Sequence, residues 1–145
     1  GEEGDHPSWR NFHLKVEVMT MPNSNSGIYF HTKYQDEGWP IYGFEAQVNN
    51  TYHRDPKRTA SLYGKVDILE APAKDEKWFT EEVILNGNEN TIKVDGKIIS
   101  RYVEPEDAKP GVPYRRIIEE GTFALQAHDP GSVVKYRSVK VKRLP

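Results

Sequence analysis

The chain has 145 residues, which is enough for one domain with its own hydrophobic core, because a domain of about 150 residues buries roughly two-thirds of its unfolded surface. Its 20 Lys and Arg residues nearly balance its 22 Asp and Glu residues, so the charge gives no support for a nucleic-acid or anionic-membrane partner. The absence of cysteine excludes disulfides, thiolate metal sites and a cysteine nucleophile, and the apolar runs are too short to span a membrane.

Two strands are predicted near the start of the chain, at Phe12–Met19 and Gly27–His31. In each, apolar residues alternate with polar ones, as the two-residue period of a β-strand requires. In the second strand, Phe30 is expected to face the core, whereas Tyr29 and His31 are expected on the opposite face. The cluster of Pro, Asn and Ser between the strands predicts a turn.

The loop that follows, at residues 33–41, carries Trp39 near its tip. A tryptophan on a loop reduces solubility unless its ring packs or binds, so Trp39 is either a lid over the core or a stacking platform for a ligand. These two interpretations remain open from the sequence.

The most informative strand is Tyr42–Asn50, with the sequence YGFEAQVNN. One face is apolar, while the other carries the carboxylate of Glu45 and the amides of Gln47 and Asn49. Solvated strand faces usually mix Lys, Thr and Glu, so this composition indicates a polar cleft. An ordinary solvent-facing side of an antiparallel sheet is the alternative.

The middle of the chain has the pattern of a scaffold. Short strands are predicted at Ser61–Gly64 and Val66–Leu69, and a meander follows from Phe79 to Tyr102. Within the meander, Asp95 and Gly96 separate two strand-like runs, which is a strong signal for a two-residue hairpin. The Pro-rich segment at residues 103–114 predicts a loop that borders any functional site.

Two further strands close the chain, at Gly121–His128 and Val133–Leu144. The first places Gln126 and His128 on the face opposite Phe123. No stretch has a helical period of useful length. Many short strands separated by Gly, Pro and Asn turns predict an all-β fold, an antiparallel two-sheet sandwich or jelly roll, as a single domain over residues 1–145.

Three of these strands present polar faces of the same kind. If they are neighbours in one concave sheet, a carboxylate, two imidazoles and several amides converge there. Amides and carboxylates bind sugar hydroxyls in pairs, and aromatic rings such as Trp39 pack against the flat faces of sugars. The sequence therefore favours a polyhydroxylated ligand.

Several blocks of the chain resemble the 3-keto-disaccharide hydrolase domain family, a former domain of unknown function. The resemblance extends from about Phe12 to Leu144 and rests on the runs NSGIYF, YGFEAQV, SLYG, GTFALQAH and VKYRSVKVKRL. It implies a concanavalin A-like jelly roll, secreted or periplasmic in carbohydrate-degrading bacteria, with the family's opening strand missing or shortened in this chain. The site residues implied are Asn25, Glu45, Gln47, Gln126 and His128, with Arg137 nearby.

The chemistry that the resemblance implies begins at a ketone on C3 of a sugar. The ketone acidifies the proton on C2, so a single base can remove it and expel the glycosidic oxygen. Glu45 or His128 is the candidate base, with the other, or His31, as the acid. Gln47, Gln126 and Asn25 would orient hydroxyls or stabilise the enolate. An oxidoreductase partner would supply the 3-keto sugar.

Other chemistries and functions remain open. A divalent metal held by His31, Glu45 and His128 would polarise the ketone, although no compact metal motif such as HExxH is present. The two-carboxylate mechanism of ordinary glycosidases needs a partner for Glu45, for which Asp67, Glu70 and Asp129 are the nominees. A non-catalytic carbohydrate-binding module and an interaction domain of a larger protein are the competing functions, because one fold serves all of them.

Overall fold

A computed structural model describes residues 8–36, 38–112, 114–126 and 128–145. The first seven residues, and Ala127 within the predicted strand at 121–128, lie outside this description. The described residues contain eight strands and no helix, and therefore no helix long and apolar enough to cross a membrane. The strands are β1 (Phe12–Thr20), β2 (Ser26–Thr32), β3 (Phe44–Val48), β4 (Phe79–Asn86), β5 (Glu89–Val94), β6 (Lys97–Val103), β7 (Thr122–Leu125) and β8 (Val134–Arg143).

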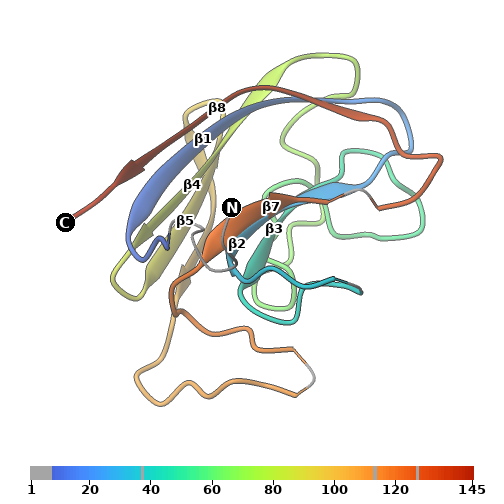
Figure 1. The fold of residues 1–145 in the computed structure, drawn as a ribbon. Coiled ribbons are helices and arrows are strands. Elements are labelled where there is room, and N and C mark those ends of the chain that lie inside the picture. The colour runs from blue at the N-terminus through green and yellow to red at the C-terminus, as the bar shows by residue number, and fades with distance from the viewer. Residues whose placement is uncertain (1–7, 37, 113, 127) are drawn as a thin grey trace.

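The strands form two antiparallel sheets that lie face to face (Figure 1). The larger sheet has the order β6-β5-β4-β1-β8 and the smaller one the order β3-β2-β7. The first strand, β1, pairs with the last, β8, which forms one edge of the larger sheet. The predicted all-β two-sheet sandwich is confirmed.

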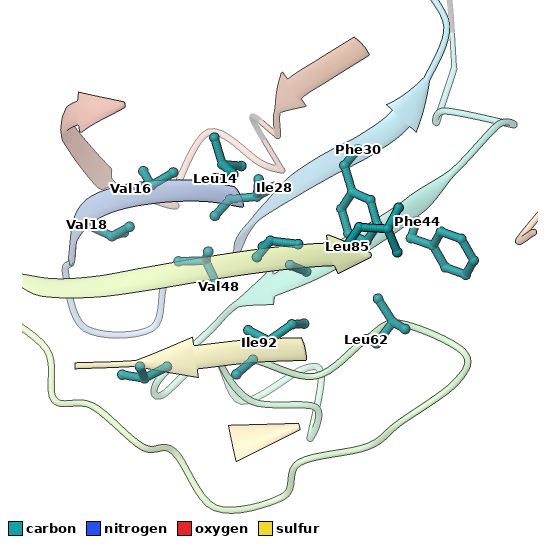
Figure 2. Close-up of a cluster of buried hydrophobic side chains, with 14 of the residues drawn as sticks. Leu14, Val16, Val18, Ile28, Phe30, Phe44, Val48, Leu62, Leu85 and Ile92 are labelled. Atoms are coloured by element: carbon teal, nitrogen blue, oxygen red, sulfur yellow. The ribbon is translucent and has the colours of Figure 1, made fainter. Parts of the chain in front are cut away.

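The hydrophobic core lies between the two sheets, where the alternation predicted from the sequence places it (Figure 2). Phe12 and Leu14 of the larger sheet are almost fully buried, as are Phe30 and Phe44 of the smaller one. The rings of Phe30 and Phe44 stack with centroids 5.5 Å apart, and Phe12 meets Phe30 edge-on at 5.7 Å. Each such side chain contributes about 1.5–3 kcal/mol by leaving water.

The predicted hairpin at Asp95 and Gly96 joins β5 to β6. Both residues have positive φ, at 49° and 81°, as a two-residue turn of this kind requires. Val94 and Lys97 pair directly across it.

The two short strands predicted at Ser61–Gly64 and Val66–Leu69 do not form, and this prediction is wrong. Leu62 makes only isolated bridges, to Ala46 and Val66, because the positive φ of Ala60 and the turn at Gly64 interrupt an extended strand. The segment nevertheless covers the free edge of β3. Across this edge, the backbone amide of Gln47 donates to the Ser61 carbonyl at 2.9 Å, and that of Tyr63 donates to the Glu45 carbonyl at 3.0 Å.

One inward-facing position of the larger sheet holds a carboxylic acid. Glu81 on β4 is fully buried, and neither of its side-chain oxygens has a hydrogen-bond partner among the described residues. Burial raises the pKa of Glu81 well above its ordinary value, which favours the neutral acid.

Candidate functional site

A cavity of about 480 Å³ lies against the polar side of the β3-β2-β7 sheet, a volume within the usual range for small-molecule sites. Strands β2 and β3 and the residues next to β2 and β7 supply half of its lining, and four loop segments supply the rest. The lining residues are Asn25, Tyr29, Trp39, Glu45, Gln47, Asp55, Tyr63, Gly64, Tyr114, Arg116, Gln126 and His128.

The structure brings together most of the residues that the sequence singled out. Their strands are neighbours, because β2 pairs with both β3 and β7. Six of the eight candidate binding or catalytic residues line this one cavity: Asn25, Trp39, Glu45, Gln47, Gln126 and His128.

Glu45 is the carboxylate of the site and is 5% exposed. Burial raises its pKa from 4.5 to about 7, against the opposing influence of the Tyr29 hydroxyl and the Arg116 guanidinium, while Asp55 raises it further. Near neutral pH the carboxyl group is therefore present in both protonation states. This is the condition in which one group takes up and releases a proton efficiently.

Tyr29 stands next to Glu45 on the neighbouring strand, in direct register with it. Burial, with the Glu45 charge, raises the pKa of the Tyr29 hydroxyl well above its ordinary value, so the phenol remains a hydrogen-bond donor. The Gln126 amide donates to the Tyr29 oxygen at 3.2 Å. Tyr29, Glu45 and Gln126 therefore link β2, β3 and the end of β7 within the cavity lining.

The amides of Gln47 and Asn25 are fixed by each other. Nε2 of Gln47 donates to Oδ1 of Asn25 at 3.0 Å in a buried contact. This leaves Oε1 of Gln47 as an acceptor and Nδ2 of Asn25 as a donor for a ligand, which is the pairing that a sugar diol requires.

Trp39 belongs to the site rather than to the core. Its side chain is 48% exposed, and its ring lies 5.7 Å from that of His128 at an interplanar angle of 31°. Of the two interpretations, lid over the core or platform at a cleft, the position supports the second. The Tyr52 ring meets the His128 ring edge-on, with the ring centroids 5.3 Å apart.

Four lining residues were missed by the strand analysis: Asp55, Tyr63, Tyr114 and Arg116. All four lie on loops in the structure, and Tyr63 belongs to the segment at Ser61–Gly64 that was predicted as a scaffold strand. Two of them sit in or directly after the Pro-rich segment that the sequence predicted to border a site. Arg116 is held by donating to the Gly43 carbonyl at 2.9 Å, and its guanidinium lies over the Tyr114 ring at 4.9 Å.

His31 does not join the cavity, contrary to the prediction. Its φ is +54°, and the pairing of β2 with β7 shifts register between Tyr29 and Thr32, so the alternation breaks and the imidazole turns into the core. The side chain is 1% exposed. Nε2 donates to the Arg10 carbonyl at 2.8 Å, and Nδ1 accepts from the Glu119 amide at 3.2 Å.

Burial lowers the pKa of His31 to about 4, so the ring is neutral with both nitrogens engaged by the backbone. The predicted ligand set of His31, Glu45 and His128 therefore does not assemble. Within the described residues no group of three or more His, Cys, Asp or Glu side chains is arranged to hold a metal ion.

Arg137 also lies outside the cavity. It belongs to β8 of the larger sheet, where it donates to Glu17 at 2.9 Å and its guanidinium lies 4.0 Å from the Trp78 ring. The three nominated partner carboxylates are likewise absent from the lining, where Asp55 stands instead.

Gly27 leaves the space that the Glu45 side chain occupies. A Cβ at this position would overlap Oε2 of Glu45 and lie 2.8 Å from its Cδ. Gly27→Ala is therefore expected to displace the carboxylate and leave the strand intact, with turnover on the substrate proposed below falling about 10- to 100-fold. Steady-state kinetics and thermal unfolding of the variant measure the two effects.

Combining Gly27→Ala with Glu45→Gln provides the control. If the glycine acts through Glu45, the double variant is no less active than Glu45→Gln alone. Additive losses would show that the glycine has a separate role.

Comparisons with known proteins agree with this geometry. A model of the 3-keto-alpha-glucoside-1,2-lyase-like domain matches residues 5–142, and this is the family that the sequence motifs indicated. No curated protein sequence matches the chain significantly.

Solved structures confirm the jelly-roll sandwich. A candidate glycosyl hydrolase from Parabacteroides distasonis aligns with a TM-score of 0.79 at 19% identity, over 96% of this chain and 74% of that one. The Bacillus subtilis carbohydrate-binding module CBM66 aligns with a TM-score of 0.65 at 13% identity, over 94% of this chain and 77% of that one. A variant of human galectin-16 aligns with a TM-score of 0.59 at 15% identity, over 92% of this chain and 89% of that one. These neighbours show the fold, and the family match identifies a carbohydrate-related domain.

Proposed function

Because the chain belongs to the 3-keto-alpha-glucoside-1,2-lyase-like domain family, we propose that its cavity binds a glycoside carrying a ketone at C3 and cleaves the glycosidic bond by elimination. The observation that carries the proposal is Glu45, a buried carboxyl with its pKa raised to about 7 in a cavity of sugar size. The proposal includes an oxidoreductase that supplies the ketone and a secreted or periplasmic location, as the sequence motifs imply.

In the first step the Glu45 carboxylate takes the proton from C2. The electron pair of the C–H bond passes into an enolate whose charge rests on the C3 oxygen. Tyr29 remains a protonated donor and Arg116 is a cation held by the Gly43 carbonyl, so both stabilise that charge.

In the second step the enolate re-forms the ketone and its electron pair makes a C1–C2 double bond. The bond between C1 and the glycosidic oxygen breaks, and His128 donates a proton to the leaving oxygen. The products are an unsaturated 3-keto sugar and a free alcohol, so the step itself consumes no water. Addition of water across the double bond would complete a net hydrolysis.

The aromatic rim favours a second candidate, a non-catalytic carbohydrate-binding module. Trp39, Tyr63 and Tyr114 line the cavity with side chains that are 36–48% exposed, as rings that stack on sugars must be. This function needs the same rim and amides and requires no proton transfer by Glu45.

Incubation with a 3-keto-glycoside and with the unoxidised glycoside distinguishes these functions. We expect the alcohol and the unsaturated keto sugar to be released from the first compound alone, as detected by mass spectrometry. A parallel incubation with a chelator measures metal dependence. Binding of both compounds without cleavage would identify a binding module. Cleavage of the unoxidised glycoside would favour a two-carboxylate mechanism using Glu45 and Asp55.

A further inference from the structure

The imidazole of His128 is joined to a carboxylate outside the cavity. Its Nδ1 lies 2.7 Å from Oδ1 of Asp129, whereas His128 itself lines the cavity and Asp129 does not. The pKa of Asp129 is held below its ordinary value, first by the Ser132 hydroxyl and next by His128, so the carboxylate is ionised near neutral pH and can only accept. Nδ1 of His128 must therefore carry the proton.

Asp129 is itself held in place from two sides. The Ser132 hydroxyl donates to Oδ1 at 2.6 Å, and the Gly131 amide donates to Oδ2 at 3.0 Å. Ser132 Oγ also accepts from the backbone amide of Asn25 at 2.9 Å. The carboxylate is thus tied to the chain segment that supplies Asn25 to the cavity.

The plane of the His128 ring is fixed independently of this bond. Trp39 lies against the ring at a shallow tilt, and the buried Tyr52 meets it edge-on. With Nδ1 bonded to Asp129, Nε2 is the polar ring atom left for a ligand, and it has no hydrogen-bond partner within the described residues.

We propose that Asp129 is a positioning residue that keeps neutral His128 in the Nδ1-protonated tautomer, so that Nε2 is the nitrogen that exchanges a proton with the ligand. The inference rests on the proposed function. When the imidazolium gives its Nε2 proton to the leaving oxygen, the tautomer that remains is the one that Asp129 accepts from. No rearrangement of the ring is then needed in the reaction.

The test compares Asp129→Asn with Glu82→Gln, which alters a matched pair remote from the cavity. On the outer side of the larger sheet, Nε2 of His13 lies 2.6 Å from Oε2 of Glu82. Both variants exchange a carboxylate for an amide beside a histidine. We expect Asp129→Asn to lower kcat on a 3-keto-glycoside by about 10²-fold with little change in KM, and Glu82→Gln to leave both unchanged.

Nitrogen-15 spectra of the His128 ring provide the readout that does not depend on turnover. In the wild type at high pH, the proton is expected on Nδ1, and in Asp129→Asn it is expected to move to Nε2. An unchanged tautomer in Asp129→Asn, or a changed tautomer with full kcat, would overturn the inference. A wild type that cleaves no 3-keto-glycoside while its tautomer responds to Asp129 would instead overturn the proposed function alone.

Discussion

Glu45→Gln is expected to lower kcat on a 3-keto-glycoside by about 10²- to 10⁴-fold, the range that a single general base contributes. Glutamine has nearly the same shape and retains hydrogen bonding to Tyr29, but its amide cannot take a proton from carbon. Because the variant keeps the sugar contacts proposed for Gln47, Asn25 and the aromatic rim, KM is expected to change little.

The comparison that makes this result specific is Asp55→Asn. Asp55 is a second carboxylate of the cavity lining, and its charge raises the pKa of Glu45. In the elimination mechanism it has no proton to transfer, so its loss is expected to cost far less than the loss of Glu45. Equal losses in the two variants would indicate the two-carboxylate mechanism, and a fully active Glu45→Gln would remove Glu45 from catalysis.

The part of the site that lies on regular strands could be read from the sequence. The two-residue period places Glu45 and Gln47 on the same side of β3, away from Phe44 in the core, and the structure has this arrangement. Gln126 and His128 follow β7 and reach the same cavity. The prediction for Glu45 and Gln47 succeeds because a strand with one face in the core fixes the direction of every side chain on it.

The predictions fail where the backbone leaves that period. His31 occupies the position that alternation assigns to the polar face, but its positive φ and the register shift beside it turn the ring inward. A histidine whose two ring nitrogens both meet backbone groups is a stable core residue, and a list of residue types does not reveal those partners. Arg137 lies outside the cavity for a different reason, because its strand β8 belongs to the larger sheet.

Residues on loops and acids in the core are two further groups that the strand period does not predict. Asp55, Tyr63, Tyr114 and Arg116 reach the cavity through loops whose paths depend on tertiary contacts, such as the bond from Arg116 to Gly43. Glu81 sits at an inward position of β4, where alternation alone would place an apolar side chain. The period identifies the buried face of a strand, but it does not forbid an acid that burial keeps neutral.

The stability of the protein is expected to depend on pH through two buried groups that act in opposite directions. The pKa of Glu45 is about 7 in the folded protein against 4.5 ordinarily, so its contribution to stability is fully present below pH 4.5 and is lost as the pH rises to about 7. The pKa of His31 is about 4 against 6.5, so its contribution is present above pH 6.5 and is lost as the pH falls to about 4. Each loss amounts to about 3 kcal/mol.

Glu45→Gln separates the two contributions, because it removes the titrating carboxyl and leaves His31 in place. At about pH 4, where Glu45 is protonated in the folded state, the variant and the wild type are expected to unfold with similar free energies. At about pH 8 the variant is expected to be more stable by about 3 kcal/mol, because it no longer buries a charge.

Denaturant unfolding of both proteins at several pH values between these limits measures the difference. In the variant, the free energy of unfolding is expected to rise steadily from about pH 4 to 6.5, as His31 of the unfolded chain loses its proton. A difference between the two proteins that stays constant with pH would show that burial does not raise the pKa of Glu45. A variant that is both inactive and more stable would show that the carboxylate is kept at a cost to the fold, which is expected of a group retained for its chemistry rather than for its packing.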